Sequence, residues 1–377
     1  MRVLRVVTLA SSSGAYGGPY DTACRQVVLG NAVDGCQARL VAGRLSHDEV
    51  ALPEGVPGAL TPVSPLLPGL GVSGLVSVKL VRLLWRETHD SATIVHVSFA
   101  RELVPLVAAL IALIRRRPLV CQPHGMLTSR TSPAHRVFDR LVVRPLVRRS
   151  SIVVCLTSSE RARLIAWLGH GSHSNMVVLG NPVLLSGRMW PPRRDGVHEI
   201  VWIARLAPRK RVRVFLEAAS LDRAADADRR YLVIGPDGGD LPRVLLCDEV
   251  EYLGAVAADE VEGCLSRADV FVLTSQDEPW GNVLALALAM GKVAIVPESA
   301  ALASSLREAE AAIVIPDDDA KALQAAIASV SVDREAAASM SRSAKLYAES
   351  NFASEAQKLN LQRIWQKSLT SQQRNGG

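Results

Sequence analysis

Residues 200–210 read IVWIARLAPRK, an apolar run of strand length followed directly by cationic residues. The run Ile200–Ala204 lies between charged residues and is typical of a buried strand. Arg205 offers a planar fork of donors and Lys210 a point charge, both just beyond the carboxyl end of that strand. Parallel sheets bind ligands at this edge, so the stretch predicts a diphosphate site. A solvated basic turn is the alternative, because three further arginines occur within residues 209–213.

Short apolar runs alternate with helical patterns on both sides of this stretch, which is the signature of parallel α/β architecture. The predicted strands of the first half are Val3–Leu9, Ala38–Val41, Ile94–Val97, Leu119–Gln122 and Ile152–Leu156. Its predicted helices are Asp21–Ala32, Leu75–Glu87, Arg101–Arg115 and His135–Arg149. The predicted strands of the second half are Ile200–Ala204, Tyr231–Ile234, Val250–Leu253, Val270–Leu273, Val293–Val296 and Ile313–Ile315, with closing helices at Asp319–Ala328, Arg334–Glu349 and Ser354–Lys367.

We therefore predict two doubly wound parallel-sheet domains that face each other across a cleft. Residues 1–183 form the first domain and residues 199–353 the second. Residues 184–198 carry prolines, glycines and an arginine pair, which is typical of a linker. The stretch Leu45–Ser73 is rich in proline and glycine without a clear period, so we predict a loop there.

The composition of the 377 residues is that of a soluble globular protein, with 49% hydrophobic and 21% charged residues. Aromatic residues make up only 4%, which argues against a nucleic-acid partner bound by base stacking. The formal charge of +6 suits a protein that handles phosphates or rests on an anionic membrane surface. The six cysteines show no metal spacing, which favours free thiols in a reducing compartment, here the cytoplasm. The longest apolar helix candidate, Leu103–Ile114, is too short to span a bilayer.

An acidic turn follows the predicted strand Val270–Leu273. Asp277 and Glu278 precede a predicted helix start at Pro279–Gly281, where unpaired backbone N–H groups favour phosphate. Glu278 can accept hydrogen bonds from sugar hydroxyls. The alternative is that one of the two carboxylates caps the helix.

Two loops of the first half occupy corresponding positions after strands. Gly17 and Gly18 belong to a glycine-rich loop between the first strand and the first helix, although the dinucleotide fingerprint is missing. His124 follows the strand Leu119–Gln122 and brings an imidazole to the carboxyl edge of the sheet. His96, at the end of its own strand, equally fits a buried core histidine.

In their order along the chain, these motifs resemble glycosyltransferase family four, the retaining transferases of the GT-B fold. The matching motifs are Gly17-Gly18, Pro123–Leu127, Thr157–Glu160, Gly180–Pro182, Ala204–Leu206 with Lys210, Tyr252–Gly254 and Glu278–Gly281. The resemblance implies that the second domain binds a nucleotide-diphosphate sugar, that the first binds the acceptor, and that a final helix, residues 354–370, returns to the first domain. The implied enzyme is a hexosyltransferase acting on a saccharide or lipid-linked acceptor in polysaccharide or glycolipid biosynthesis.

The resemblance also assigns roles to single residues. Arg205 and Lys210 would hold the donor diphosphate, and Glu278 would hold the transferred sugar. The amides of Gly281, Asn282 and Val283 would bind donor oxygens, His124 would lie near the reacting centre, and Gly17 and Gly18 would line the phosphate side. Such enzymes retain the anomeric configuration without an obvious protein nucleophile, so no catalytic base is assigned. They generally need no metal, and we expect no cofactor beyond the donor substrate.

One departure from the family pattern affects the donor site. The family has a second glutamate eight positions after the first, which grips the nucleotide ribose, and Leu286 stands there in this chain. A lost charged hydrogen bond costs about 1.5–3 kcal/mol. A degenerate GT-B homologue that binds a sugar or a partner without turnover is therefore the main alternative. A nucleotide-sugar 2-epimerase and a nicotinamide dehydrogenase fit less well, because no acid/base carboxylate pair and no dinucleotide fingerprint stand out.

The segment Arg136–Arg149 (RVFDRLVVRPLVRR) is basic and amphipathic, and Arg115–Arg117 adds charge nearby. We therefore predict peripheral contact with an anionic membrane at the inner face. The alternative is a solvated domain helix, in which Pro145 would interrupt the amphipathic stripe.

Overall fold

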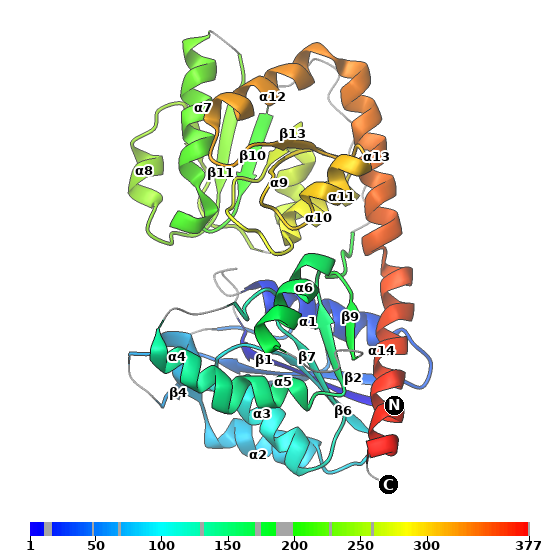
Figure 1. Cartoon of the computed structure of the whole chain (residues 1–377). Helices are drawn as coiled ribbons and strands as arrows, with labels where there is room; N and C mark the ends of the chain where they lie inside the picture. Colours follow the sequence, from blue (N-terminus) through cyan, green and yellow to red (C-terminus); the bar gives the residue numbers. More distant parts are fainter. Residues whose placement is uncertain are drawn as a thin grey trace. The chain divides into compact units, whose positions relative to one another are not determined.

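The computed structural model describes residues 1–10, 17–46, 49–66, 69–128, 132–169, 175–185, 199–225, 228–257 and 260–375, and the chain divides into two compact units (Figure 1). Of the described residues, unit 1 contains those up to Pro182 together with the C-terminal segment from Ser354, and unit 2 contains those from Val183 to Ala353. Each unit is built on one large parallel sheet, which confirms the predicted α/β architecture.

The sheet of unit 1 has seven strands in the order β3-β2-β1-β6-β7-β8-β9, and every neighbouring pair is parallel. The strands are β1 (Arg2–Leu9), β2 (Gln37–Arg44), β3 (Gly58–Pro62), β6 (Thr93–Ser98), β7 (Leu119–Gln122), β8 (Ile152–Cys155) and β9 (Met176–Val178). The central strands β6 and β7 are buried along their whole length, because helices cover both faces of the sheet. This burial explains why both strands are rich in apolar residues.

Seven α-helices accompany this sheet in the described residues of unit 1. They are α1 (Gly17–Asn31), α2 (Val78–Glu87), α3 (Leu103–Ile114), α4 (Pro133–Phe138), α5 (Arg144–Arg148), α6 (Ser158–Leu168) and α14 (Ser354–Asn375). A π-helical turn, Asp139–Val143, joins α4 to α5. A short antiparallel pair, β4 (Ser64–Pro65) with β5 (Leu75–Val76), flanks a 3-10 turn at Gly71–Gly74.

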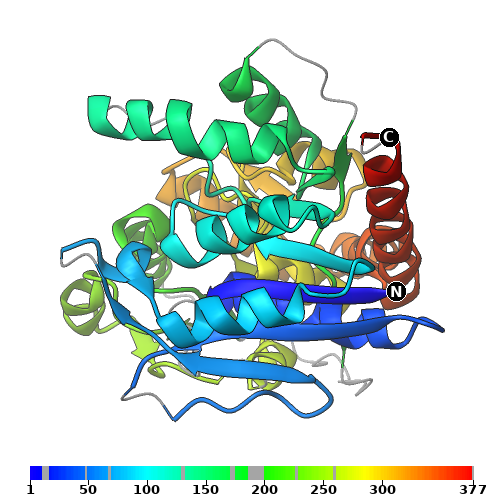
Figure 2. The ribbon, with the colours of Figure 1, turned by 90° about the horizontal axis from the view of Figure 1, so that it is seen from below.

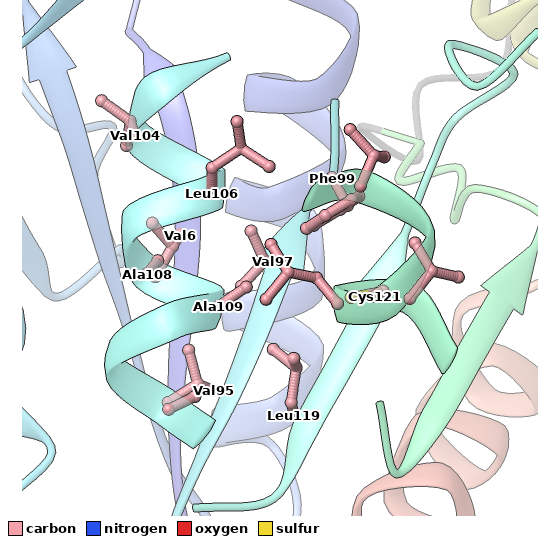
Figure 3. Close-up of a cluster of buried hydrophobic side chains, with 14 of the residues drawn as sticks. Val6, Val95, Val97, Phe99, Val104, Leu106, Ala108, Ala109, Leu119 and Cys121 are labelled. Carbon is pink, nitrogen blue, oxygen red and sulfur yellow. The ribbon is translucent and has the colours of Figure 1, made fainter. Parts of the chain in front are cut away.

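The core of unit 1 forms where the apolar helix α3 lies on the sheet. Ala108 and Ala109 let the helix approach Val6 of β1 and Val97 of β6, as Figure 3 shows. Cys121 of β7 lies in the same cluster and is fully buried, and burial raises the pKa of its thiol to about 12. The six cysteines are all free thiols, as their spacing predicts.

The sheet of unit 2 has six parallel strands in the order β12-β11-β10-β13-β14-β15. The strands are β10 (Glu199–Ile203), β11 (Arg230–Ile234), β12 (Val250–Tyr252), β13 (Val270–Val272), β14 (Val293–Pro297) and β15 (Ile313–Ile315). The helices are α7 (Val212–Ala224), α8 (Leu241–Leu245), α9 (Val261–Arg267), α10 (Asn282–Ala289), α11 (Ala303–Glu308), α12 (Ala320–Val332) and α13 (Arg334–Phe352), with a 3-10 turn, η3, at Pro208–Lys210.

One expectation about the first half of the chain was wrong. The stretch Leu45–Ser73, predicted to be a loop, contains β3, which pairs with β2 at the edge of the sheet. Proline and glycine are tolerated at such an edge, so composition hid the strand. Pro145 lies in the first turn of α5, which follows the π-helical turn.

Residues 186–198 of the predicted linker lie outside the described residues. Within the part of the chain that is described, no helix combines the length and apolar character needed to cross a bilayer.

Candidate active site

The predicted diphosphate loop follows β10 and is held against the loop after its neighbour β11. Leu206 donates its N–H to the carbonyl of Pro236 (2.9 Å), and its own carbonyl accepts from Gly238 (3.0 Å). Arg205 lies so close to Gly238 that a Cβ at that glycine would be 2.8 Å from its Cδ. A Cβ at Gly235, whose φ is +146°, would be 1.8 Å from the carbonyl oxygen of Ala204. Glycines therefore allow the two loops to pack together at the carboxyl ends of adjacent strands.

The structure brings together the basic and acidic motifs of unit 2. Lys210 ends the η3 turn, and its Nζ lies 2.6 Å from Oε2 of Glu278, 68 residues further along the chain. The Lys210 carbonyl accepts a hydrogen bond from Thr274 Oγ1 (2.8 Å), which itself accepts one from the indole N–H of Trp202 (2.8 Å). Both partners of the ion pair are thus fixed at the ends of β10 and β13, two neighbouring strands.

The other arginines of the basic loop have partners of their own. Arg211 lies 3.4 Å from Asp317, and Arg213 pairs with Glu217 and Asp318. Arg209 is exposed and donates to the Asp277 carbonyl (3.4 Å), whereas Arg211 and Arg213 are half-buried, so the solvated basic turn fits Arg209 best. Lys210 points instead to the buried Glu278, so its position is not explained by a surface turn.

The Glu278 carboxylate is nearly buried, with about a tenth of its side chain exposed. Burial opposes its ionisation, but the charge and hydrogen bond of Lys210 outweigh this effect and hold the pKa below its usual value. The Glu278 carboxylate is therefore ionised near neutral pH, 2.6 Å from Lys210 Nζ at the edge of the sheet.

The helix α10 starts beside this pair, one turn later than the sequence suggested. Gly281 is its N-terminal cap with a φ of +80°, and no side chain caps the helix. Neither Asp277 nor Glu278 therefore caps it, which removes the simplest alternative role for these carboxylates. Asn282 and Val283 form the first turn, where helical geometry leaves backbone N–H groups without intrahelical acceptors and the dipole is positive.

Leu286 lies in the second turn of α10 and is 6% exposed. Its neighbours on the same helix, Leu284 and Leu288, are also buried. The position at which the family carries its second glutamate is thus part of an apolar packing surface here.

In unit 1, His124 stands in a sharp turn just after β7. Its φ is +53° and that of Gly125 is +74°, both in the left-handed region. Glu160 of α6 holds this turn, because one carboxylate oxygen accepts from the Gly125 N–H (2.5 Å) and the other from the Leu156 N–H (2.6 Å). Glu160 occurs in a family motif, but the sequence alone assigned it no function.

A buried polar cluster lies beneath the imidazole of His124. Its Nε2 is 3.2 Å from Ser98 Oγ, which accepts a hydrogen bond from Arg5 (3.1 Å). Arg5 is fully buried, and it also donates to the carbonyl of His96 (2.8 Å). Burial and the Arg5 charge lower the pKa of His124 to about 3. His124 is therefore a neutral imidazole near pH 7, able to hydrogen-bond but not to act as a general acid.

His96 is a core histidine, one of the two readings that the sequence left open. It is fully buried, and its Nδ1 accepts a hydrogen bond from the indole N–H of Trp365 in α14 (3.2 Å). Burial, together with the charge of Arg5, holds its pKa well below the usual value.

The remaining candidates, Gly17 and Gly18, form the start of α1, and the Gly18 carbonyl accepts a hydrogen bond from Thr22. The loop before them, residues 11–16, lies outside the described residues. Unit 2 therefore carries Arg205, Lys210, Glu278 and the start of α10, while His124 and the two glycines belong to unit 1.

Thr274 and Trp202 are site residues that the sequence reasoning missed. Thr274 lies two residues after β13 at the carboxyl edge, and that position was the available signal. No group of three His, Cys, Asp or Glu side chains suited to a metal ion occurs among the residues that the structure describes.

Charged loops and a helix start at the carboxyl edge of a parallel sheet suit an anionic phosphate ligand. Comparison with protein families agrees: residues 197–333 match the family "Glycosyl transferases group 1", and residues 20–182 match the "Glycosyl transferase 4-like domain". The chain belongs to the group 1, family four-like glycosyltransferases.

Solved structures show the same fold. HepE from Anabaena, solved in complex with UDP, is 18% identical, with a TM-score of 0.70 over 96% of this chain and 99% of that one. Sucrose-phosphate synthase from Thermosynechococcus elongatus is 16% identical, with a TM-score of 0.76 over 98% and 99%. The pneumococcal O-GlcNAc transferase GtfA, in complex with UDP and GlcNAc, is 10% identical, with a TM-score of 0.74 over 98% and 99%. These structures share the GT-B fold with the chain. No curated protein matches the chain by sequence.

Proposed function

We propose that the chain is a retaining hexosyltransferase that moves a sugar from a nucleotide-diphosphate sugar to a saccharide or lipid-linked acceptor. The observation that carries the proposal is the 2.6 Å contact between Lys210 Nζ and Glu278 Oε2. A donor of this kind has an anionic diphosphate next to a hydroxyl-rich sugar, and a cation beside a hydrogen-bond acceptor matches both halves. Polysaccharide or glycolipid biosynthesis is the process in which such a transfer would serve.

Each candidate residue has a role in this proposal. Lys210 and Arg205 bind the diphosphate, and the amides of Gly281, Asn282 and Val283 bind donor oxygens at the positive end of α10. Glu278 accepts hydrogen bonds from the sugar hydroxyls. In unit 1, the neutral His124 hydrogen-bonds near the reacting centre, and the start of α1 at Gly17 and Gly18 lies on the phosphate side.

The reaction needs no proton from the protein. The bond between the anomeric carbon and the diphosphate oxygen breaks, and the acceptor oxygen bonds to the same face of that carbon. The proton of the acceptor hydroxyl passes to the leaving phosphate. The charge that develops on this phosphate is stabilised by Lys210 and Arg205, which stay fixed during the reaction. Because the stabilising cations belong to the protein, we propose that no metal or cofactor takes part.

Uridine is the base that we propose for the donor. HepE and GtfA were solved with UDP, and both share the GT-B fold with this chain. The similarity to these two structures is in fold alone, so it does not indicate which sugar the donor carries. The experiment below identifies that sugar.

The test is ligand-observed NMR on the full chain with uridine, guanosine and adenosine diphosphate sugars, in parent and Arg205→Ala protein. We expect one donor to bind selectively and to be lost in the variant, and a product with the anomeric configuration of the donor. Binding without turnover over a range of acceptors would support the degenerate homologue instead. A product of inverted configuration would refute the retaining mechanism.

A further inference from the structure

Three helical segments of unit 1 lie side by side on one face of its sheet. They are α2, α3 and the continuous segment from α4 to α5, and Figures 1 and 2 show them together. We call their outward surface the α2–α5 face. It is formed by residues 78–87, 103–117 and 133–149.

The α2–α5 face exposes large apolar side chains from all three segments. Their exposed fractions range from 44% for Trp85 to 69% for Leu141. The exposed set is Val78, Trp85, Leu110, Ile114, Val137 and Leu141. Several large apolar side chains exposed on one face indicate a site of contact with a partner or a membrane.

The same face is strongly basic. Its three segments contain eleven lysines and arginines but only two acidic residues, Glu87 and Asp139. Glu87 lies within 4 Å of three arginines. Asp139 is buried, and its carboxylate accepts two hydrogen bonds from the Arg101 guanidinium. Neither carboxylate therefore offsets the positive charge that the face presents to solvent.

The cations and the apolar side chains are interleaved. The Arg115 guanidinium lies over the ring of Trp85, with 3.8 Å between its Cζ and the ring centroid, which joins the end of α3 to α2. Leu141 stands in the π-helical turn directly after the exposed Arg140. Long basic side chains around apolar ones are the arrangement with which interfacial helices bind lipid: the apolar groups enter the headgroup boundary while the cations stay with the headgroups.

We propose that the α2–α5 face docks on the surface of an anionic lipid bilayer. A second copy of the chain fits less well, because a symmetric contact would bring the exposed cations of one face, eight of the eleven, against those of the other. A nucleic acid would meet the cations but leave the apolar side chains in water. The proposal extends the sequence-based prediction from Arg136–Arg149 and Arg115–Arg117 to a defined face, and it does not depend on the sugar-transfer reaction.

The test is co-sedimentation of the full chain with vesicles of phosphatidylcholine, with and without phosphatidylglycerol, at low and high salt. Two variants separate the components of binding. The charge variant combines Arg82→Gln, Arg136→Gln and Arg140→Gln, and the apolar variant combines Ile114→Ser with Leu141→Ser. A matched control removes the same charge from exposed positions of unit 2, with Lys321→Gln, Arg342→Gln and Lys345→Gln.

We expect salt-sensitive binding of the parent and the control to the anionic vesicles. The charge variant should bind about a hundredfold more weakly, since each cation near an anionic leaflet contributes roughly a factor of five. The apolar variant should also bind more weakly while keeping its salt dependence. No binding by the parent, or equal binding by the charge variant and the control, would overturn the proposal. So would a dimer of the parent that the apolar variant abolishes, because it would assign the face to a second copy.

Discussion

At the residue scale, the ion pair between Lys210 and Glu278 affects how the results of single substitutions at the site are interpreted. Both side chains are largely buried, so removing one charge leaves the other in a poorly solvated place. Loss of binding in a single variant therefore needs a stability measurement beside it. Neutral replacements of similar size are preferable to alanine for this reason.

Glu160 is predicted to act on catalysis through the turn that it holds. The Glu160→Gln substitution keeps one acceptor oxygen but replaces the other with an amide donor, which cannot serve both the Gly125 and Leu156 N–H groups. We expect a fall in kcat of about tenfold with a smaller change in donor KM, because the His124 turn loosens while unit 2 is unaffected. A fall in stability with unchanged kcat would show that Glu160 has only a structural role.

Leu286 provides a test of the missing ribose contact. Leu286→Glu places a carboxylate in an apolar setting and should lower the free energy of unfolding by about 2 kcal/mol or more without donor. If residue 286 faces the ribose, the new acceptor should tighten donor binding about tenfold, measured by calorimetric titration. An unchanged donor Kd in the folded variant would show that this part of α10 does not contact the nucleotide.

The lowered pKa of His124 predicts how stability depends on pH. The folded pKa of about 3 lies below the unfolded value of about 6.5, so in that interval the unfolded chain binds more protons. Stability should therefore be full above pH 6.5 and fall towards pH 3, at up to about 1.4 kcal/mol per pH unit from His124. His96 lies beside the same Arg5 and, with its pKa also lowered, adds to the same trend.

The control for this prediction is His124→Asn, because asparagine tolerates the left-handed backbone. Denaturant unfolding at several pH values should give a shallower slope for the variant than for the parent. Equal slopes between pH 6.5 and pH 3 would contradict a neutral, buried His124.

At the scale of elements, the docking of α14 on α1 depends on a small residue. A Cβ added at Gly30 of α1 would lie 2.8 Å from the ring of the buried Trp365, and on its other side 3.1 Å from the Cβ of Ala38. Gly30→Ala should therefore destabilise unit 1 by about 1–3 kcal/mol, measured by denaturant unfolding. Gly263→Ala in α9 is the matched control, since nothing lies within 4 Å of the added methyl, and it should stabilise the chain slightly. Equal effects of the two substitutions would contradict the packing of α14.

The elements that the sequence predicted best are those buried on both faces. β7, β10 and β14 are buried along their whole length, and their predicted limits lie within one residue of the observed ones. β3 and β9 were missed although the edge strands β12 and β15 were predicted, because β3 has the sequence GALTP and β9 is only three residues long. The π-helical turn before Pro145 was not predicted either.

The candidate site was only partly predictable for a related reason. Lys210 and Glu278 each follow a strand, so their approach could be expected once β10 and β13 were taken as neighbours. The support from Thr274 and Trp202 depends on side-chain contacts that no spacing in the sequence encodes. The same holds for Arg5 and Ser98 beneath His124.

At the scale of the whole molecule, the donor-side candidates other than Gly17 and Gly18 all lie in unit 2. The formal charge of +6 also has a structural location, because the three segments of the α2–α5 face contain eleven of the 43 lysines and arginines but only two of the 37 acidic residues. The donor site and the proposed lipid surface therefore belong to different units, and each can be removed without altering the other.

The measurement that tests the central claim most directly is calorimetric titration with two ligands: the donor selected by NMR and its nucleotide diphosphate without the sugar. Lys210→Gln and Glu278→Gln are compared with the parent and with the exposed control Lys345→Gln. We expect Lys210→Gln to weaken both ligands about tenfold or more, and Glu278→Gln to weaken only the complete donor. Folded variants that bind both ligands as tightly as the parent, or a Glu278→Gln variant that weakens the two ligands equally, would contradict the assignment of diphosphate to Lys210 and sugar to Glu278.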